Sequence, residues 1–341
     1  MDDMYPVLEA ITPSCQNPMV LATVIKVEGS AYKKAGAAML LRANQSRVGM
    51  LTAGCLEEDL TARAGLVWAS GESCTVRYDM RDEDDLSWGQ GAGCIGVITL
   101  LLEPVIGKTL QHLLTLKNCL DKKQTVTRVK RFTRELVPRE EMYVVEDGSV
   151  FGDDYPDWNL DDFKETMNNY PFKKGLVSAG NSTDLYFVHP VVPRPHVYVF
   201  GAGEDARPLV SLAARVGFGV SVIDWRPGLC ARDYFPDAAQ LLVEMPAEAI
   251  PKLSFTEKDF AVVMTHQYQK DQLILQELQK KKLFYLGVLG PRNRTERLLG
   301  MENVPPAIHS PIGLSIGAAG PEEIAVSIVG EMIQRIRKAQ A

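Results

Sequence analysis

The sequence lacks any apolar run long enough to cross a lipid bilayer. Its longest candidate, Val97 to Leu102, is ended by Glu103, whereas a membrane helix needs about 18–20 apolar residues. The amino terminus is acidic and has no basic segment followed by an apolar one, so the sequence predicts neither a secretory signal nor a membrane span. We therefore expect a cytoplasmic protein.

The sequence also has little that could bind a metal through cysteine. Its six cysteines include no pair separated by two residues and no cysteine–histidine spacing of a zinc site. They also lack the pattern that holds iron–sulfur clusters. In a cytoplasmic chain these cysteines are expected to be reduced, and we predict no structural metal.

The sequence has fewer positive than negative side chains: 37 Lys and Arg against 43 Asp and Glu, which give a net charge of −6. Nucleic-acid-binding proteins usually carry a basic footprint, so we predict no such partner. The local exception is the segment from Lys117 to Arg134, which contains Lys122, Lys123, Arg128, Lys130 and Arg131. This pattern favours a solvent-exposed hairpin face, and the alternative is a surface for an anionic ligand or an acidic partner.

The length of the chain predicts two domains, because 341 residues exceed a typical single domain. The segment His189–Pro195 contains three prolines, which stiffen the chain and oppose regular strand pairing. We therefore place an N-terminal domain over residues 1–190 and a C-terminal domain over residues 196–341.

The N-terminal domain is predicted to be a mixed, strand-rich α+β fold. Apolar and β-branched runs predict strands at Val20–Val27, Ala37–Leu41, Cys74–Tyr78 and Gly96–Leu102. Helical spacing of apolar residues predicts helices at Leu56–Ser70 and Thr109–Leu120. The segment Thr125–Val188 is typical of hairpins, with a turn at residues 146–148.

The C-terminal domain is predicted to be a Rossmann-type α/β fold, because short apolar strands alternate with helices. The strands are expected at His196–Phe200, Gly219–Ile223, Phe260–Met264 and Phe284–Leu289. The helices are expected at Ala206–Val216, Gln269–Lys281, Arg292–Leu299 and Pro321–Arg337. This alternation indicates a parallel sheet that is covered on both faces and binds ligands beyond the carboxyl ends of its strands.

The first strand of that domain leads into a glycine-rich turn. Gly201, Gly203 and Ala206 form a G-x-G-x-x-A motif between a strand and a helix. The first glycine permits the tight turn, the second lets a phosphate approach the backbone, and Ala206 allows close helix packing. Asp224, at the end of the next strand, stands where a carboxylate accepts ribose hydroxyls. The alternative is a tight turn without a ligand.

Two carboxylates complicate this turn. Glu204 and Asp205 stand where an anionic phosphate would lie. At a helix N-terminus such groups stabilise the helix by about 0.3–1 kcal/mol each. They could therefore act as a surrogate anion, which weighs against a bound dinucleotide.

Other strand ends of the C-terminal domain also carry polar groups. His266 follows the third strand, and Arg292 and Arg294 follow the fourth. Arginine suits phosphate recognition, whereas His266 could equally be a packed or capping histidine. Gly313 belongs to a glycine-rich loop before the last helix, which either approaches a ligand or only shapes the loop.

Two cysteines of the N-terminal domain stand in glycine-rich frames. Cys55 follows Gly54 where a helix begins, a place that lowers a thiol pKa. Cys94 follows Gly93, and either thiol could instead be a small buried apolar residue. The loop Gly29–Ala37 adds Lys33 and Lys34, so the three segments together could bind an anionic, sulfur-containing ligand. The remaining cysteines are interpreted as structural: Cys15, Cys74, Cys119 and Cys230.

The motifs of both domains together resemble the XdhC/CoxI family. In the N-terminal domain the resemblance rests on Leu21–Val24, Gly29-Ser30, Gly36–Leu40, Gly54–Glu57, Trp88–Cys94 and Leu102–Pro104. In the C-terminal domain it rests on Phe200–Gly203, Asp224–Arg226, Phe235-Pro236, Thr265-His266, Asp271, Leu286–Gly290, Pro311–Gly317 and Pro321–Ser327. The chain departs from the family at the glycine turn, where Glu204 and Asp205 replace the usual His and Val.

This resemblance implies an accessory protein of molybdenum hydroxylases in purine catabolism. Such a protein binds the molybdenum cofactor, molybdopterin, assists its sulfuration and inserts it into an apo-hydroxylase of the xanthine dehydrogenase type. A cysteine desulfurase is a further partner under this hypothesis, and a homo-oligomer is expected. Cys55 and Cys94 would lie at the molybdenum, with Gly201, Gly203 and Arg292 at the phosphate, and no catalytic residue is assigned.

Two alternative functions remain open. An NAD(P)-dependent oxidoreductase would use His266 as a proton donor beside a nicotinamide. A nucleotide-sensing regulatory protein would respond by domain closure. The thiols of the N-terminal domain favour the accessory protein, whereas Glu204 and Asp205 would repel the pyrophosphate of a dinucleotide.

Overall fold

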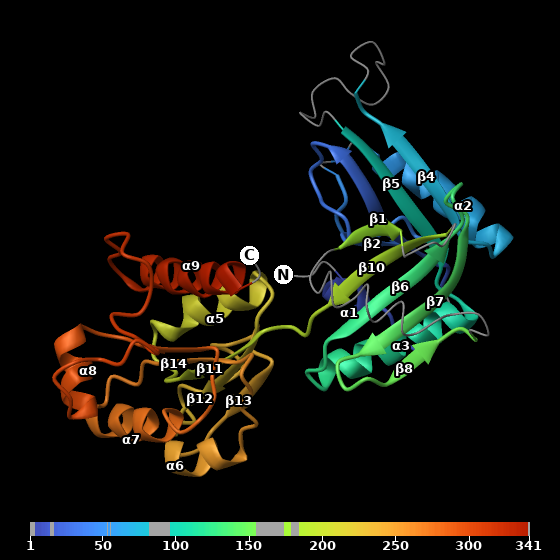
Figure 1. The fold of residues 1–341 in the computed structure, drawn as a ribbon. Coiled ribbons are helices and arrows are strands. Elements are labelled where there is room, and N and C mark those ends of the chain that lie inside the picture. The colour runs from blue at the N-terminus through green and yellow to red at the C-terminus, as the bar shows by residue number, and fades with distance from the viewer. Residues whose placement is uncertain are drawn as a thin grey trace. The chain divides into compact units, whose positions relative to one another are not determined.

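The computed structural model divides the chain into two compact units, residues 2–193 and residues 194–341. It describes residues 4–13, 17–52, 54, 56–81, 96–154, 174–178 and 184–339. Within these ranges, no helix combines the length and the apolar content that a bilayer crossing requires. Figure 1 shows the elements of each unit.

The N-terminal unit begins with an antiparallel sheet of order β3-β2-β1-β5-β4. Its strands are β1 (Met19–Gly29), β2 (Ala38–Arg42), β3 (Arg47–Gly49), β4 (Cys74–Asp79) and β5 (Gly96–Pro104). Helix α2 (Glu57–Ser70) packs Leu60, Ala64 and Val67 against one face of this sheet. The strand-rich α+β architecture expected for this unit is confirmed.

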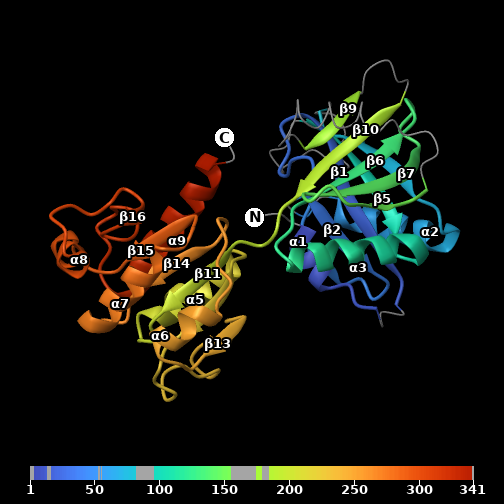
Figure 2. The ribbon, with the colours of Figure 1, turned by 60° about the horizontal axis from the view of Figure 1, so that its bottom comes forward.

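A second antiparallel sheet of the same unit has the order β8-β7-β6-β10-β9. Its strands are β6 (Val126–Phe132), β7 (Pro138–Val145), β8 (Val150–Gly152), β9 (Gly175–Ser178) and β10 (Leu185–Val191). Helices α1 (Met4–Glu9) and α3 (Gly107–Asp121) lie side by side (Figure 2) and share one apolar core with residues of both sheets.

The expectation that His189–Pro195 would avoid strand pairing is wrong for its first residues. Strand β10 continues to Val191 and pairs antiparallel with β6, with Pro190 opposite Thr127. On the other side of β10, β9 pairs only as far as Val188. Proline is tolerated here because its missing N–H can face the side without a partner strand.

The expectation of a solvent-exposed basic face is also wrong at its centre. Arg128 is fully buried, and its guanidinium contacts the carboxylates of Glu103 and Glu141. Lys130, 7% exposed, lies 2.8 Å from Glu103 through its Nζ atom. Burial would raise the pKa of Glu103, but Arg128 and Lys130 outweigh it and lower that pKa to about 2. We call these four residues the charge cluster; it joins β5 of the first sheet to β6 and β7 of the second.

The C-terminal unit contains one parallel sheet of order β13-β12-β11-β14-β15-β16. Its strands are β11 (His196–Phe200), β12 (Gly219–Ile223), β13 (Gln240–Leu242), β14 (Phe260–Val263), β15 (Tyr285–Val288) and β16 (Ile308–His309). The order reverses between β11 and β14, as it does in a Rossmann fold. The predicted Rossmann-type α/β class is confirmed.

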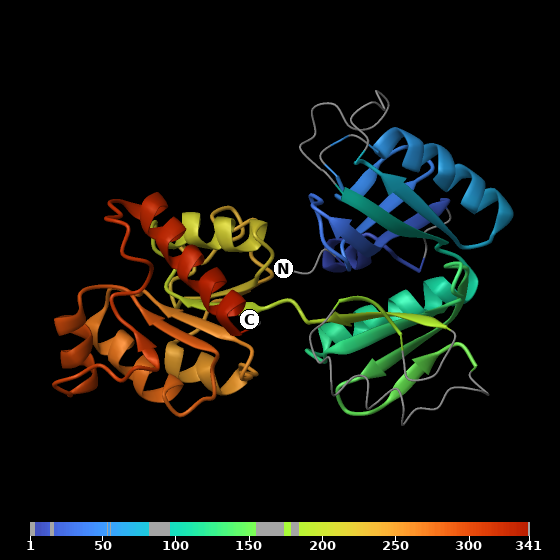
Figure 3. The ribbon, with the colours of Figure 1, turned by 45° about the horizontal axis from the view of Figure 1, so that its top comes forward.

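Helices cover both faces of this parallel sheet (Figure 3). One face packs on α5 (Ala206–Arg215) and α9 (Pro321–Ala339). The other packs on α6 (Pro246–Ala249), the short 3-10 helix η1 (Ile250–Lys252), α7 (Tyr268–Leu278) and α8 (Arg292–Leu299). Successive residues of β11 alternate between the two cores, which explains why the strand is apolar throughout.

Candidate functional site

The glycine-rich turn between β11 and α5 adopts the predicted strand–turn–helix form. Gly201 has a φ of +121°, and a Cβ atom at this position would lie 2.5 Å from the carbonyl oxygen of Met264. Only glycine allows this close approach of the β11 end to the β14 end. Ala206 is fully buried in the core beneath the helix, as expected.

Asp224 is fully buried at the end of β12 and is bonded within the domain. One carboxylate oxygen accepts a 2.8 Å hydrogen bond from the backbone N–H of Ala202, and Arg226 donates to both oxygens at 2.7–2.9 Å. Burial would raise the pKa of Asp224, but the hydrogen bonds from Arg226 and Ala202 outweigh it and lower that pKa. The carboxylate therefore braces the glycine turn, and a ribose hydroxyl could reach it only by replacing these bonds.

The side chain of Asp205 covers the glycine turn. Its Oδ1 atom lies 2.7 Å from the position of a Cβ atom on Gly203, which shows how closely the carboxylate approaches the second glycine. Its Oδ2 atom lies 2.6 Å from Nε2 of His266, which follows β14. The space where a phosphate would approach the backbone thus holds a carboxylate of the protein itself.

His266 reaches this position at a conformational cost. Its φ is +60°, in the left-handed region that non-glycine residues rarely adopt. Its side chain is 61% exposed, so the pair with Asp205 lies at the surface. The sequence places both residues at the same sheet edge but does not predict that they pair.

A second bonded group lies at the ends of β14 and β15. Asp271 is fully buried; it accepts a 2.6 Å hydrogen bond from the hydroxyl of Thr265 and a 2.7 Å bond from Arg294. Arg292, by contrast, has a side chain that is 56% exposed and a 3.5 Å contact with Glu296. Of these two arginines, Arg292 is the one that an external phosphate could reach.

Gly313 lies in the loop before α9 and is held by that helix. Its backbone N–H donates to Glu331 at 2.7 Å, and its φ is +95°. The carboxylate of Glu331 also accepts a 2.5 Å bond from the Tyr285 hydroxyl and lies 2.6 Å from Nδ1 of His309. A Cβ atom on Gly313 would clash with Oγ of Ser327. This glycine is therefore explained by packing of the loop against α9.

The two cysteines predicted to hold a ligand, Cys55 and Cys94, lie outside the described residues, as does Cys15. Burial raises the pKa of the other three thiols, Cys74, Cys119 and Cys230, so these thiols are poor nucleophiles. Within the described part of the chain, no group of three His, Cys, Asp or Glu side chains could hold a metal ion.

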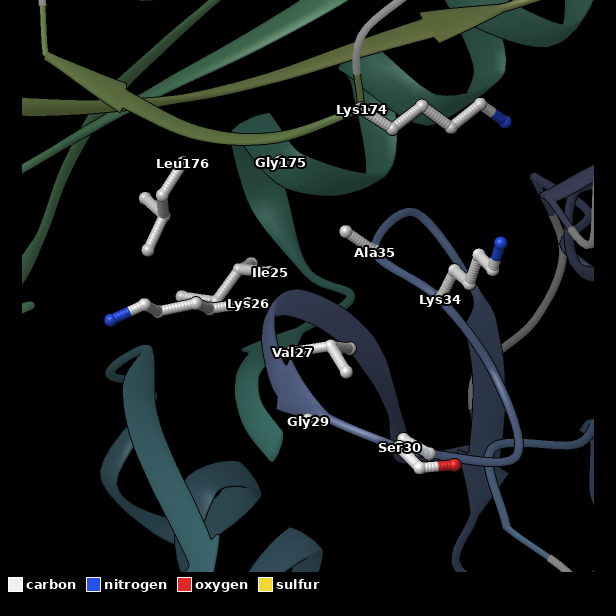
Figure 4. A pocket seen from close by; sticks show the side chains of 11 residues that line it. Ile25, Lys26, Val27, Gly29, Ser30, Lys34, Ala35, Lys174, Gly175 and Leu176 are labelled. Carbon is white, nitrogen blue, oxygen red and sulfur yellow. The ribbon is translucent and has the colours of Figure 1, made fainter. Parts of the chain in front are cut away.

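A pocket of about 680 Å³ lies in the N-terminal unit, and Figure 4 shows it from close by. It lies between the end of β1, the loop that follows β1, and the start of β9. It is lined by Ile25, Lys26, Val27, Gly29, Ser30, Ala31, Lys34, Ala35, Lys174, Gly175 and Leu176. The sequence singles out the loop with Gly29 and Lys34, but nothing in the pattern indicates that Lys174, just before β9, would join it.

The glycine turn of the C-terminal unit and the pocket of the N-terminal unit differ in the charges that an anionic ligand would meet. At the glycine turn, the carboxylate of Asp205 occupies the approach, so the observed conformation does not fit the pyrophosphate of a dinucleotide. In the pocket, the described lining residues include three lysines and no carboxylate. One of these lysines, Lys26, pairs with Glu28 at 2.5 Å. The volume of the pocket lies within the range of small-molecule sites, about 300–1,000 Å³.

Family models match three segments of the chain, two in the N-terminal unit and one in the C-terminal unit. Residues 197–332 match the model described as the XdhC Rossmann domain. Residues 15–79 match the model of the XdhC and CoxI family, and residues 107–191 match the model described as the BH1974-like central domain.

Individual proteins are similar over nearly the whole chain. A probable xanthine dehydrogenase subunit of Bacillus subtilis (strain 168) is 41% identical over 334 residues, which cover 98% of each chain. A crystal structure of a xanthine dehydrogenase from Bacillus halodurans is 41% identical, with a TM-score of 0.87, and the match covers 99% of this chain and 96% of that one. The molybdenum cofactor insertion chaperone PaoD of Escherichia coli (strain K12) is 22% identical over 327 residues, 92% of this chain and 82% of PaoD.

Proposed function

This chain belongs to the XdhC and CoxI family, and we propose that it is an accessory protein of a molybdenum hydroxylase of the xanthine dehydrogenase type. In this role it binds the molybdenum cofactor, assists its sulfuration and delivers it to the apo-hydroxylase. A cysteine desulfurase is the sulfur donor for that step, and the working form is a homo-oligomer.

The observation that carries this proposal is the extent of the similarity to PaoD, which is named as a molybdenum cofactor insertion chaperone. The match spans 92% of this chain and so includes all three segments that the family models recognise. A function that used only the Rossmann domain would not require similarity over the N-terminal unit. The relative from Bacillus subtilis, named as a probable subunit of xanthine dehydrogenase, supports a hydroxylase as the partner.

The geometry of the Rossmann domain weighs against NAD(P)-dependent hydride transfer. An NAD(P)-dependent oxidoreductase needs the glycine turn for pyrophosphate and the acidic residue after β12 for ribose. Here Asp205 covers the turn and Asp224 is bonded to Ala202 and Arg226. In the proposed role, Arg292, whose side chain is 56% exposed, is the accessible cation of this edge for the phosphate.

Cys55 and Cys94 are assigned to the molybdenum end of the cofactor. Thiolates are soft ligands and suit a metal that itself carries sulfur ligands. In the sequence, Cys55 stands two residues before the first residue of α2, and a helix N-terminus favours the thiolate of a nearby cysteine. When the cofactor is bound, it supplies the molybdenum centre, and the protein supplies the thiols and the cationic groups that hold it.

The test is purification of the protein from a host that makes the cofactor, followed by molybdenum analysis and pterin fluorescence. Cys55→Ala and Cys94→Ala should each reduce retained molybdenum at least roughly tenfold, because loss of even an outer-shell partner of a metal ligand costs about 10- to 100-fold in metal affinity. Cys119→Ala, at a partly exposed thiol with a raised pKa, is the matched control and should retain as much as the wild type. A wild-type protein that carries neither molybdenum nor pterin but oxidises NAD(P)H would replace this proposal with the oxidoreductase.

A further inference from the structure

We infer that the contact between Asp205 and His266 is an autoinhibitory latch, which closes the glycine turn and whose release makes His266 a binding residue for the phosphate. We call this contact the latch. The inference deepens the proposed function, because it concerns the regulation of the same sheet edge, and it rests on that function for the identity of the ligand. The latch itself follows from the geometry of residues 201–206 and 264–266.

The carboxylate of Asp205 marks where the oxygens of an anion would lie. Its Oδ1 atom is 2.7 Å from the position of a Cβ atom on Gly203, the glycine that lets a phosphate approach a Rossmann turn. Its Oδ2 atom is 2.6 Å from Nε2 of His266. A single small anion therefore contacts the turn and the histidine together. A phosphate that replaced this carboxylate would place an oxygen within hydrogen-bond distance of Nε2.

The side chain of Asp205 contacts His266 instead of capping its own helix. Asp205 is the N-cap residue of α5, a position where a carboxylate usually accepts a hydrogen bond from an N–H group of the first turn. Within the described chain, its side chain forms no capping bond with α5. Release of the latch would therefore remove no cap from the helix, and the closed turn is not needed to hold α5 together.

The parallel sheet places His266 where it can serve either partner. The N–H of Met264 donates to the carbonyl of Phe200 at 2.9 Å, so the end of β14 lies directly beside the start of the glycine turn. His266 follows with a φ of +60°. Strained residues of this kind persist only where the surrounding structure holds them, and they are common in ligand clamps and switches. Because its side chain is 61% exposed, His266 can exchange Asp205 for a ligand that arrives from solvent.

The latch makes binding at this edge selective. A bound phosphate must first displace the carboxylate of Asp205, which repels it and occupies the donor of His266. An exposed acid–base pair contributes little free energy, so a ligand can displace it. A ligand that also contacts Arg292 gains the interaction that offsets this loss, whereas a phosphate that contacts the turn alone does not. The closed turn therefore admits a ligand with several contacts along the edge.

The experiment measures whether the effects of Asp205 and His266 on anion binding depend on each other. Inorganic pyrophosphate is titrated by isothermal titration calorimetry into four full-length proteins: wild type, Asp205→Ala, His266→Asn and the double variant. We expect Asp205→Ala to bind about fivefold tighter than wild type, because a like charge leaves the start of α5. His266→Asn should change the affinity of the wild type by less than about twofold, since Asp205 already uses the histidine. In the Asp205→Ala protein the same substitution should weaken binding about tenfold, because the histidine then donates to the anion.

Glu204→Gln is the matched control, because the exposed Glu204 removes one charge from the same turn and should leave the effect of His266→Asn as it is in the wild type. Asparagine tolerates a positive φ, and circular dichroism checks that each variant is folded. Equal effects of His266→Asn with and without Asp205 would overturn the inference, as would an Asp205→Ala protein that binds no tighter than wild type. A gain that depends on His266, in a protein that carries no molybdenum from the producing host, would uphold the latch and refute the proposed function.

Discussion

Two glycine-containing loops of this protein, one in each unit, carry opposite charge. The turn at residues 201–206 follows a buried strand and is covered by the carboxylate of Asp205. The loop at residues 29–36 also follows a strand, but it contributes Lys34 to a pocket completed by Lys174. Glycines therefore specify how the backbone can bend, while the neighbouring charges determine which ligand can approach.

The contrast extends to the acidic residues around each loop. In the C-terminal unit, the carboxylates remain at the sheet edge and pair there: Asp205 with His266, Asp224 with Arg226, and Asp271 with Arg294. In the N-terminal unit, Glu103 and Glu141 are buried and pair with Arg128 in the charge cluster. Among the described residues that line the pocket, the charged side chains are lysines, and Lys26 pairs with Glu28.

The largest expected effect on stability follows from removal of Glu103, a buried carboxylate of the charge cluster. Glu103→Ala leaves Arg128 and Lys130 buried without their shared partner, and removal of one member of a buried ion pair costs about 3–5 kcal/mol. Urea unfolding followed by circular dichroism measures the loss. Glu140→Ala, which removes one of two surface partners of Arg131, should change stability by less than about 1 kcal/mol. Equal effects of the two substitutions would show that the buried cluster contributes no more to stability than a surface ion pair.

The next effect tests the shape of the Rossmann turn. Gly201→Ala forces a side chain into a φ of +121° and against the carbonyl oxygen of Met264. Such backbone strain costs about 1–3 kcal/mol, and thermal unfolding should show a lower midpoint. Gly228→Ala is the control, since a Cβ atom there meets nothing within 4 Å. A Gly201→Ala protein as stable as the wild type would mean that the turn can relax away from β14.

The smallest effect tests whether the carboxylate of Asp205 takes the place of a bound anion at the glycine turn. Asp205→Asn keeps the shape of the side chain and removes its charge from the start of α5. Because a charge at a helix N-terminus contributes about 0.3–1 kcal/mol, we expect ADP to bind up to roughly fivefold tighter, with little loss of stability. Isothermal titration calorimetry measures the gain, and Asp237→Asn, bonded to Ser211 at the surface, is the control. If ADP affinity does not change, the charge of Asp205 is not what excludes a phosphate from the turn.

The sequence is most informative about the C-terminal sheet. Strands β11 and β12 and helix α8 begin and end where the pattern predicts, because uniformly apolar strands alternate with helices of clear period. The short edge strands β13 and β16, of three and two residues, are not predicted. So few residues carry no periodicity, and their pairing is decided by the neighbouring strand.

The polar groups are harder to predict because their partners are distant in the chain. Arg128 pairs with Glu103, 25 residues away, so the local pattern of a basic hairpin wrongly indicates a solvent-exposed face. Asp224 stands at the position of a ribose acceptor, but Arg226 and the Ala202 backbone already use its oxygens. Lys174 reaches the pocket through strand pairing in the second sheet, which local spacing does not reveal.

The charge cluster also makes the N-terminal unit a single cooperative element. Glu103 comes from β5, whereas Arg128, Lys130 and Glu141 come from β6 and β7. A truncated protein ending after β5 would retain a buried anion without a cation, and one beginning at β6 would have two cations for one anion. Because the two sheets share this cluster and one apolar core, we expect the N-terminal unit to unfold in one transition.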